Sequence, residues 1–290
     1  MKESYKPYET EEILDYFFYR PIASYFVKAV QNTSITPNQI TVISLVFGMV
    51  AGVFLSPYYS IPFVGIILLA ISNILDCSDG QLARVRKSGS MAGRVFDGLA
   101  DSFVFFSIYL FSCLKFNDTY GWYIWAIAVV ASVGHSMQSS FFDYYRNEYI
   151  SFVIKNYKSE ATTTQTILNE IDLLKNVKGK WFDRFLLRFY YLYTKIQEKS
   201  NKKNTLRDKY EIPKNFADTY REKNRVLLRF WSVLGATAHI TYVMIFAAFD
   251  RMDLYFIFEA GFLNIYMIVM KIIQNRAIYS IEKKLLPFKQ

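Results

Sequence analysis

A long stretch without charged residues constrains this chain more than any other feature. Between Lys28 and Asp76, 47 consecutive residues include no Asp, Glu, Lys or Arg, and only the turn-like segment SPYYSIP at 56–62 interrupts their apolar character. A helix that spans a bilayer needs about 20 apolar residues. The stretch therefore predicts two antiparallel transmembrane helices joined by a short turn.

Four further apolar segments predict further spans, in a chain of 290 residues that is 52% hydrophobic. These segments are 93–114, 119–142, 230–249 and 254–274. Six spans put both termini on one side of the membrane. If that side is the cytoplasm, only Lys115 and Arg251 of the 34 Lys and Arg residues fall in exterior loops, as the positive-inside rule requires. We therefore expect an all-α integral membrane protein, multi-pass, with six transmembrane helices and both termini cytoplasmic.

The N-terminal segment 10–31 has apolar and charged positions at a helical period, with Thr10 as a candidate N-cap and Glu11 and Glu12 in the first turn. This pattern fits a juxtamembrane amphipathic helix that lies in the cytoplasmic interface. It fits equally well a helix packed on the membrane bundle.

One long polar region, 144–225, holds 18 Lys and Arg against 10 Asp and Glu, which supplies +8 of the chain's net charge of +9. Its amphipathic stretches ILNEIDLL and WFDRFLLRFYYLYTKI predict a helical cytoplasmic insertion that suits the surface of an anionic leaflet. A solvated insertion explains the composition as well. Nucleic acid is not an expected partner, because no recognition motif accompanies the basic residues. The predicted division is 1–143 with four spans, 144–225 as the insertion, and 226–290 with two spans.

Four aspartates stand at the ends of the second and third predicted spans: Asp76, Asp79, Asp97 and Asp101. Spacings of three and four place each pair on one helix face, and the short segment 85–89 brings both pairs to the same membrane depth. An ionised Asp at the bilayer centre costs about 2.5–3.5 kcal/mol, and like charges repel. A shared divalent cation removes both penalties, and oxygen-only ligands suit Mg²⁺, Mn²⁺ or Ca²⁺ better than zinc. Four carboxylates can hold two ions.

The neighbouring residues supply features that phosphate binding needs. Arg84 stands about one turn beyond Asp79 and offers a permanently charged, bidentate donor. Gly80, Ala83 and Gly93 leave room for a ligand or a helix backbone to approach closely. The alternative is a salt-bridge network between the aspartates and nearby cations, but most of those cations lie in the connecting segment. Metal ions and arginine at a membrane face therefore indicate phosphoryl chemistry on a lipid.

This order of residues resembles the signature of the CDP-alcohol phosphatidyltransferase family. The signature is filled at eight positions over 26 residues: Asp76, Asp79, Gly80, Ala83, Arg84, Gly93, Asp97 and Asp101. The six-span layout and the ITPNQIT segment before the first span are also similar. The long insertion at 144–225 departs from compact members of the family.

The resemblance implies a role for each matching residue. Asp76, Asp79 and Asp97 would bind Mg²⁺ or Mn²⁺, and Asp101 would complete the second metal site and act as the general base. Gly80, Ala83, Gly93 and Arg84 would line the CDP site, with Asn38 and Thr41 near the cytidine. The implied reaction moves a phosphatidyl or phospho-alcohol group from a CDP-activated lipid or CDP-alcohol to an alcohol acceptor at a cytoplasmic active site, with release of CMP. The resemblance also implies a homodimer.

The identity of the alcohol stays open at this point. The motifs DGQLAR and FDGLAD are more similar to branches that handle inositol-type head groups, while choline, ethanolamine and sphingolipid head-group transfer remain alternatives. A phosphorylated acceptor needs cations at the cytoplasmic ends of later spans, where the chain offers Arg146, Arg225, Arg229, Lys271 and Arg276.

Two other classes of protein compete with this interpretation. A divalent-cation transporter needs carboxylates along a path across the bilayer, whereas these cluster at one depth. A catalytically inactive scaffold does not require every signature position to be filled. His135 and His239, each alone in an apolar span, are interpreted as hydrogen-bonded packing residues rather than ligands. Glu259 and Asn264 are expected to face the bundle interior.

Overall fold

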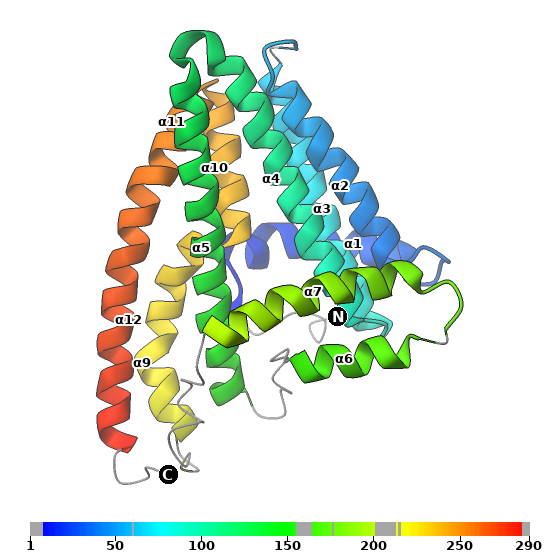
Figure 1. Cartoon of the computed structure of the whole chain (residues 1–290), viewed down its shortest axis with the longest axis vertical. Helices are drawn as coiled ribbons and strands as arrows, with labels where there is room; N and C mark the ends of the chain where they lie inside the picture. Colours follow the sequence, from blue (N-terminus) through cyan, green and yellow to red (C-terminus); the bar gives the residue numbers. More distant parts are fainter. Residues whose placement is uncertain are drawn as a thin grey trace.

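The computed structural model describes residues 8–59, 61–154, 164–175, 177–200, 213 and 216–285, and these residues form helices and no strand. The long helices run side by side along the molecule, while α1, α6 and α7 lie across them near the lower ends of α2, α3 and α4 (Figure 1). The α-helices are α1 (Arg20–Val30), α2 (Pro37–Phe54), α3 (Pro62–Val85), α4 (Met91–Tyr120), α5 (Trp122–Val153), α6 (Thr164–Leu173), α7 (Trp181–Ser200), α9 (Phe216–Trp231), α10 (Ala236–Ala248), α11 (Met252–Ile257) and α12 (Asn264–Leu285). Short turns are η2 (Tyr8–Thr10) and η4 (Ser232–Leu234), which are 3₁₀-helical, and η3 (Asp15–Tyr19) and η5 (Phe258–Leu263), which are π-helical.

Four helical segments within the described residues are long and apolar enough to cross a membrane. They are α2, α3, α4 and the continuous stretch Met252–Lys283. The charge-free run therefore forms two helices, α2 and α3, as predicted. The chain is an all-helical integral membrane protein.

The structure differs from the predicted spans at 119–142 and 230–249. Helix α5 has 32 residues, about 48 Å of helix, but its Ser, His and Gln residues lower its mean hydropathy. The segment 230–249 is not one helix, because α9 with η4 meets α10 at a 42° bend. The described helices thus supply four spans, or five if the bent pair counts as one.

The bend occurs where the N-terminal segment packs against the start of α10. The Glu12 carboxylate accepts hydrogen bonds from the backbone N–H groups of Ala238 at 2.9 Å and Thr237 at 3.4 Å. These are orphan donors of a helix N-terminus, which a carboxylate satisfies well. A Cβ at Gly235 would collide with the same carboxylate. The apolar run is therefore broken by a contact from residues more than 200 positions away.

The helices that carry the aspartates begin at well-defined caps. Thr36 and Gln39 form a reciprocal capping box at the start of α2, with Pro37 in the first turn. At the start of α4, the Ser90 hydroxyl accepts a hydrogen bond from the Gly93 N–H at 3.0 Å. These caps fix the ends of α2 and α4 that face the aspartate cluster.

Small residues let α2 approach α3 and α4 closely. Ser44 and Ser72 exchange hydrogen bonds with each other's backbone carbonyls at 2.8 Å. A Cβ at Gly48 would lie 2.9 Å from the Ser72 hydroxyl, and one at Gly52 would lie 2.8 Å from the Ser107 backbone. Close backbone approach is the usual basis of helix association in membranes. These three helices therefore form a tight unit that holds the aspartates in place.

Arg86, just after α3, ties this unit to the chain between α1 and α2. Its guanidinium donates to four backbone carbonyl oxygens, at 2.5–3.1 Å. The acceptors are Val30, Gln31, Thr33 and Ile35. Arg86 therefore has a structural role.

The N-terminal segment 10–31 is helical over most of its length, but its start differs from the predicted N-cap. Thr10 lies in η2, and η3 leads directly into α1 with Pro21 in the first turn. Helix α1 packs on α3 through Val27 and Val30, and Tyr25 points outward with 71% of its surface exposed. The packing on the bundle is therefore established, whereas an interfacial position is not.

The insertion is helical where it is described. The two stretches predicted as amphipathic helices form α6 and α7, which pack on the start of α4 through Ile167, Leu187 and Ala92. Helix α5 continues without a break across the predicted boundary at 143 and ends at Val153.

Candidate active site

Three of the four signature aspartates meet between α3 and α4. Each of Asp76, Asp79 and Asp97 has a carboxylate oxygen within 4.8 Å of one from the other two. Asp79 is buried, and the other two are partly exposed. The ligand set is all oxygen, which fits a hard divalent cation. Asp101 lies one turn further along α4 and lines an adjacent cavity.

Residues predicted to bind the CDP group surround this cluster. The Thr41 hydroxyl donates to Asp79 Oδ2, so α2 orients one of the carboxylates. A Cβ at Gly93 would lie 3.3 Å from Asn38 Oδ1 and 3.1 Å from Ser90 Oγ. The N-terminal ends of α2 and α4 therefore approach each other closely. A Cβ at Gly80 would contact the guanidinium of the exposed Arg84 at 3.4 Å. The structure thus brings Asn38, Thr41, Gly80 and Gly93 to the same end of the bundle as the aspartates.

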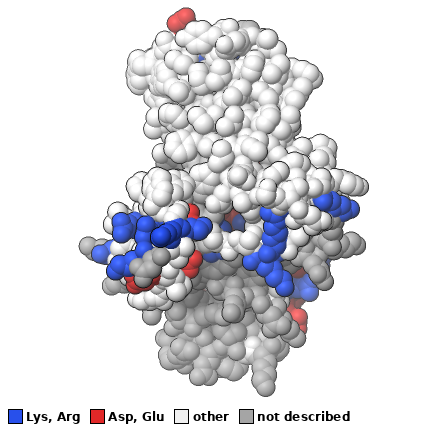
Figure 2. All heavy atoms as spheres, turned by 90° about the vertical axis from the view of Figure 1, so that its right-hand side faces the viewer, with Lys and Arg blue, Asp and Glu red and all other residues white. Residues whose placement is uncertain are grey.

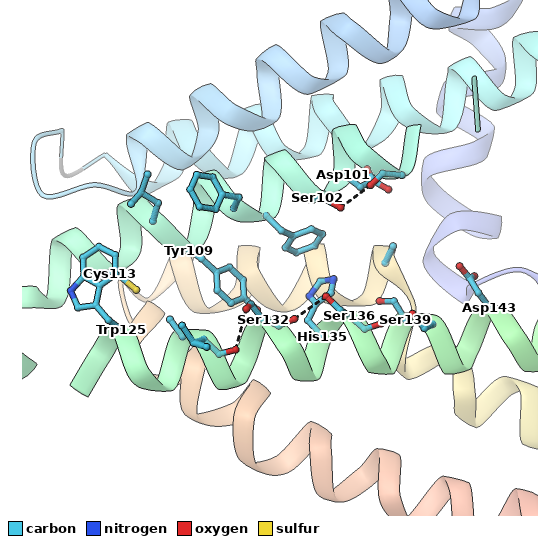
Figure 3. A pocket seen from close by; sticks show the side chains of 18 residues that line it. Asp101, Ser102, Tyr109, Cys113, Trp125, Ser132, His135, Ser136, Ser139 and Asp143 are labelled. Atoms are coloured by element: carbon cyan, nitrogen blue, oxygen red, sulfur yellow. Dashed lines mark hydrogen bonds between the residues drawn. The ribbon is translucent and has the colours of Figure 1, made fainter. Parts of the chain in front are cut away.

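A cavity of about 560 Å³ extends from Asp101 between α4 and α5. Asp101 and Asp143 lie at one end, and Cys113 and Trp125 lie at the other (Figure 3). Between them, the wall on α5 carries hydroxyl groups and one imidazole, from Ser132, His135, Ser136 and Ser139. The rest of the lining is mostly aromatic and aliphatic. The cavity can therefore accept a largely apolar group whose polar end reaches Asp101.

The N-terminal segment forms a charged wall behind Asp76. Asp15 accepts hydrogen bonds from the Thr237 hydroxyl at 2.6 Å and from Cys77 Sγ at 3.8 Å. Glu11 pairs with Arg20 at 2.9 Å. Burial raises the pKa of Glu12 to about 8 and also raises the pKa of Asp15. This wall was not predicted, because the sequence alone does not show that 11–20 folds back against α3 and α10.

Four of the five basic residues proposed for the acceptor have other contacts, and none of the five lines the cavity. Arg146 pairs with Asp143 at 2.7 Å, and Arg225 approaches Glu9 at 3.3 Å. Arg229 donates to the backbone carbonyls of Glu11 and Tyr8. Lys271 lies over the Phe141 ring, 4.5 Å from its centroid. Arg276 lies in the middle of α12.

A second buried cluster joins the two histidines that were expected to be isolated. His239 Nδ1 lies 3.0 Å from Glu259 Oε2, and the rings of His135 and His239 are stacked with centroids 4.0 Å apart and planes 28° apart. One ligand atom from each of the three residues lies within 4.8 Å of the others. Stacked rings point their in-plane nitrogen lone pairs side by side rather than towards one ion. The geometry therefore favours packing over metal binding, with a hydrogen bond between His239 and Glu259 and with Glu259 buried in the bundle interior as expected.

The sequence reasoning missed the cavity wall on α5. A signal was present, because serines at 132, 136, 139 and 140 recur at helical spacing on one face of an otherwise apolar segment. The histidine cluster had no such signal, since its members lie on three separate elements.

Fold and site together define an integral membrane protein with an acidic cluster and an adjoining, mostly apolar cavity. Residues 34–171 match the family model described as CDP-alcohol phosphatidyltransferase, so the chain carries a domain of this family. The matching region begins just before α2 and ends in α6, and it contains all eight signature positions. The family resemblance expected from the signature is confirmed.

Two curated relatives share the name bifunctional IPC transferase and DIPP synthase. The relative from Archaeoglobus fulgidus is 29% identical over 178 residues, which is 61% of this chain and 32% of the relative. The relative from Thermococcus kodakarensis is 30% identical over 163 residues, which is 56% of this chain and 33% of the relative. The matches therefore span about a third of the length of these relatives.

Proposed function

We propose that this protein transfers a phosphatidyl or phospho-alcohol group from a CDP-activated donor to an alcohol acceptor and releases CMP. The observation that carries the proposal is the meeting of Asp76, Asp79 and Asp97 one helical turn away from Asp101, which lines a cavity. The family match at 34–171 supports the same reaction class.

The metal requirement follows from the donor set. We propose that Asp76, Asp79 and Asp97 bind Mg²⁺ or Mn²⁺, with Asp101 completing a site for a second ion. Such ions, when bound, neutralise charge on the diphosphate and polarise the attacked phosphorus. Thr41 holds Asp79 in place through its hydrogen bond, as partners of metal ligands commonly do.

The protein's own residues divide the remaining work. Asp101 takes the proton from the hydroxyl group of the acceptor alcohol. The oxygen of that hydroxyl forms the new bond to phosphorus, and the bond from phosphorus to CMP breaks. Arg84 contacts the diphosphate, and Gly80, Ala83 and Gly93 leave space for the CDP group. Asn38 and Thr41 lie on the side proposed for cytidine. The weaker acceptor candidates are Arg146, Arg225, Arg229, Lys271 and Arg276.

The cavity supports a lipid as one of the two substrates. Its Asp101 end is polar and its far end, at Cys113 and Trp125, is apolar, which suits a hydrocarbon chain attached to a polar reacting group. The named relatives and the motif both support an inositol-type head group. Choline, ethanolamine or sphingolipid head-group transfer is the alternative within the same chemistry.

The proposed setting is a membrane with the active site and both termini on the cytoplasmic side. The distribution of Lys and Arg supports this orientation. Six spans result if α5 and the bent pair α9–α10 each cross the bilayer. We further propose an N-terminal segment at the membrane interface and a division of the chain into regions at residues 143 and 225. We also propose a homodimer, which rests on the family resemblance alone.

The test is a CMP-release assay on the purified full chain in lipid nanodiscs. CDP-diacylglycerol is offered with candidate alcohols, and labelled CDP-alcohols are offered with diacylglycerol or ceramide. We expect Mg²⁺- or Mn²⁺-dependent CMP release with one pair, abolished in Asp101→Asn and retained in Asp118→Asn, the same substitution at an exposed position near the opposite end of α4. Metal uptake into vesicles without CMP release from any pair would instead support the transporter.

A further inference from the structure

Helix α7 lies across the end of the membrane bundle rather than along it (Figure 1). It contacts α4 and α6, and these contacts involve one of its faces. Leu186 and Leu187 on that face are 4% and 0% exposed. Where its side chains are described, helix α7 is therefore packed against the rest of the protein through one face, and this packing sets the direction in which its opposite face points.

The packed face of α7 contacts the beginning of the helix that carries Asp97. Leu187 packs with Ala92, and the Phe182 ring meets the Phe96 ring edge-on with centroids 5.8 Å apart. Phe96 immediately precedes Asp97. An interaction that restrains the position of α7 therefore also restrains the position of the first turns of α4.

Nearly opposite the packed face, α7 presents a stripe of large apolar side chains. Trp181, Phe185, Phe189 and Leu192 are 68%, 60%, 57% and 58% exposed. At about 100° per residue, their spacing of four, four and three confines them to an arc of about 80°. Scattered single apolar residues are ordinary on a surface, but a continuous stripe of this kind marks an interaction site. We call these four residues the α7 stripe.

Basic residues border the α7 stripe along one side. Arg184, Arg188 and Lys195 fall within about 60° of its edge on the same helical projection. On the face that carries the turn between α6 and α7, Lys and Arg side chains gather in a band below a broad uncharged surface (Figure 2). An apolar arc with cations at its edge matches a helix at the boundary between lipid head groups and acyl chains, where cations reach anionic head groups.

We propose that α7 is an interfacial anchor, whose stripe inserts into an anionic leaflet and whose packed face positions the start of α4. The partner is the lipid surface itself. Two observations favour a lipid surface over a second protein. The cations beside the stripe complement anionic lipid. Helix α4, which packs against α7, is long and apolar enough to cross a bilayer and carries exposed apolar side chains such as Phe103. This inference concerns the insertion and does not depend on the proposed transferase activity.

The experiment is depth-dependent fluorescence quenching on the full chain in nanodiscs of phosphatidylcholine and phosphatidylglycerol. Acyl chains carry bromine near the head group or near the chain end, and the difference between the wild type and Trp181→Phe isolates Trp181 from the other three tryptophans. We expect strong quenching of Trp181 by bromine near the head group and weaker quenching by bromine near the chain end. Absence of quenching from either position overturns the proposal and indicates that water or a protein covers the α7 stripe.

Two pairs of variants test the anchor's chemistry and its consequence. The double variant Arg188→Gln with Lys195→Gln should weaken the binding of α7 to the lipid surface about fivefold for each lost cation in anionic nanodiscs. In nanodiscs of pure phosphatidylcholine the same variant should behave like the wild type. The double variant Phe185→Ser with Phe189→Ser should raise amide exchange over residues 91–97. Leu173→Ser, an exposed position on α6 outside the stripe, is the matched control and should change neither. Unchanged exchange in the double Phe variant would contradict the positioning role.

Discussion

The described residues include two clusters with three potential metal ligands each, and the clusters differ in how those ligands are held. Asp76, Asp79 and Asp97 come from two consecutive helices and contribute only oxygen. His135, His239 and Glu259 come from three elements and are joined by a hydrogen bond and a ring stack. In each cluster, one ligand atom from each residue lies within 4.8 Å of those from the other two.

The difference teaches that proximity alone does not make a metal site. Three carboxylates brought together repel one another, and only cations or protons relieve that repulsion. The histidine cluster lacks this mutual repulsion, because a neutral imidazole donates to the single carboxylate and stacks on a second ring, although His135 Nδ1, His239 Nε2 and Glu259 Oε1 have no hydrogen-bond partner among the described residues. We therefore propose that the metal ions bind at the aspartates, and the following predictions can break or sharpen that contrast.

Asp101→Asn should abolish CMP release, and within the metal cluster itself the largest effect is expected at Asp97. Replacing Asp97 with Asn removes one charge from the proposed metal site without changing side-chain size. CMP release should fall about 10²–10³-fold, the range for losing one preorganised electrostatic group. Rates are to be measured across a Mg²⁺ titration in nanodiscs. Full activity at the wild-type metal concentration would remove Asp97 from the site.

A smaller effect is expected at Thr41. Thr41→Val keeps the side-chain shape and deletes the hydrogen bond to Asp79. Metal affinity or activity should drop about 10–100-fold, as for other partners of metal ligands. Thr41→Ser retains the hydroxyl and should recover most of the loss. Equal behaviour of the Val and Ser variants would show that the hydrogen bond does not matter.

The histidine cluster should respond in stability rather than in catalysis. His239→Gln breaks the contact to Glu259 and should cost about 1–3 kcal/mol of folding free energy, typical of a buried polar group that loses its partner. Thermal unfolding and CMP release are measured on the same preparation. We expect a lower Tm with a rate per folded molecule close to that of the wild type. A large loss of rate at unchanged Tm would move the chemistry towards this cluster.

The smallest effect concerns Glu12, a buried acid outside the spans. Its folded-state pKa of about 8 lies above the ordinary value of 4.5, so the unfolded chain loses its proton first as pH rises. The wild type should therefore lose stability between about pH 4.5 and about pH 8. Glu12→Gln removes this contribution, so its Tm relative to the wild type should rise over that interval. A Tm difference that is constant with pH would contradict the raised pKa.

The sequence predicted those features that depend on neighbours in the chain. The spacing within 76–101 and the short connection between two spans were sufficient to bring Asp76, Asp79 and Asp97 together, and amphipathic periodicity located α6 and α7. The break at Gly235 could not be predicted, because the apolar run around it is continuous and Glu12 comes from the other end of the chain. The pairing of His239 with Glu259 likewise depends on tertiary packing, with η5 aiming the carboxylate inward.

The most direct test of the central contrast is a count of bound divalent ions. Mn²⁺ binding to the purified full chain in nanodiscs is measured by electron paramagnetic resonance for the wild type, Asp97→Asn and His239→Gln. The account predicts that Asp97→Asn loses bound Mn²⁺ while His239→Gln keeps the wild-type amount. Loss of Mn²⁺ in His239→Gln with retention in Asp97→Asn would contradict it.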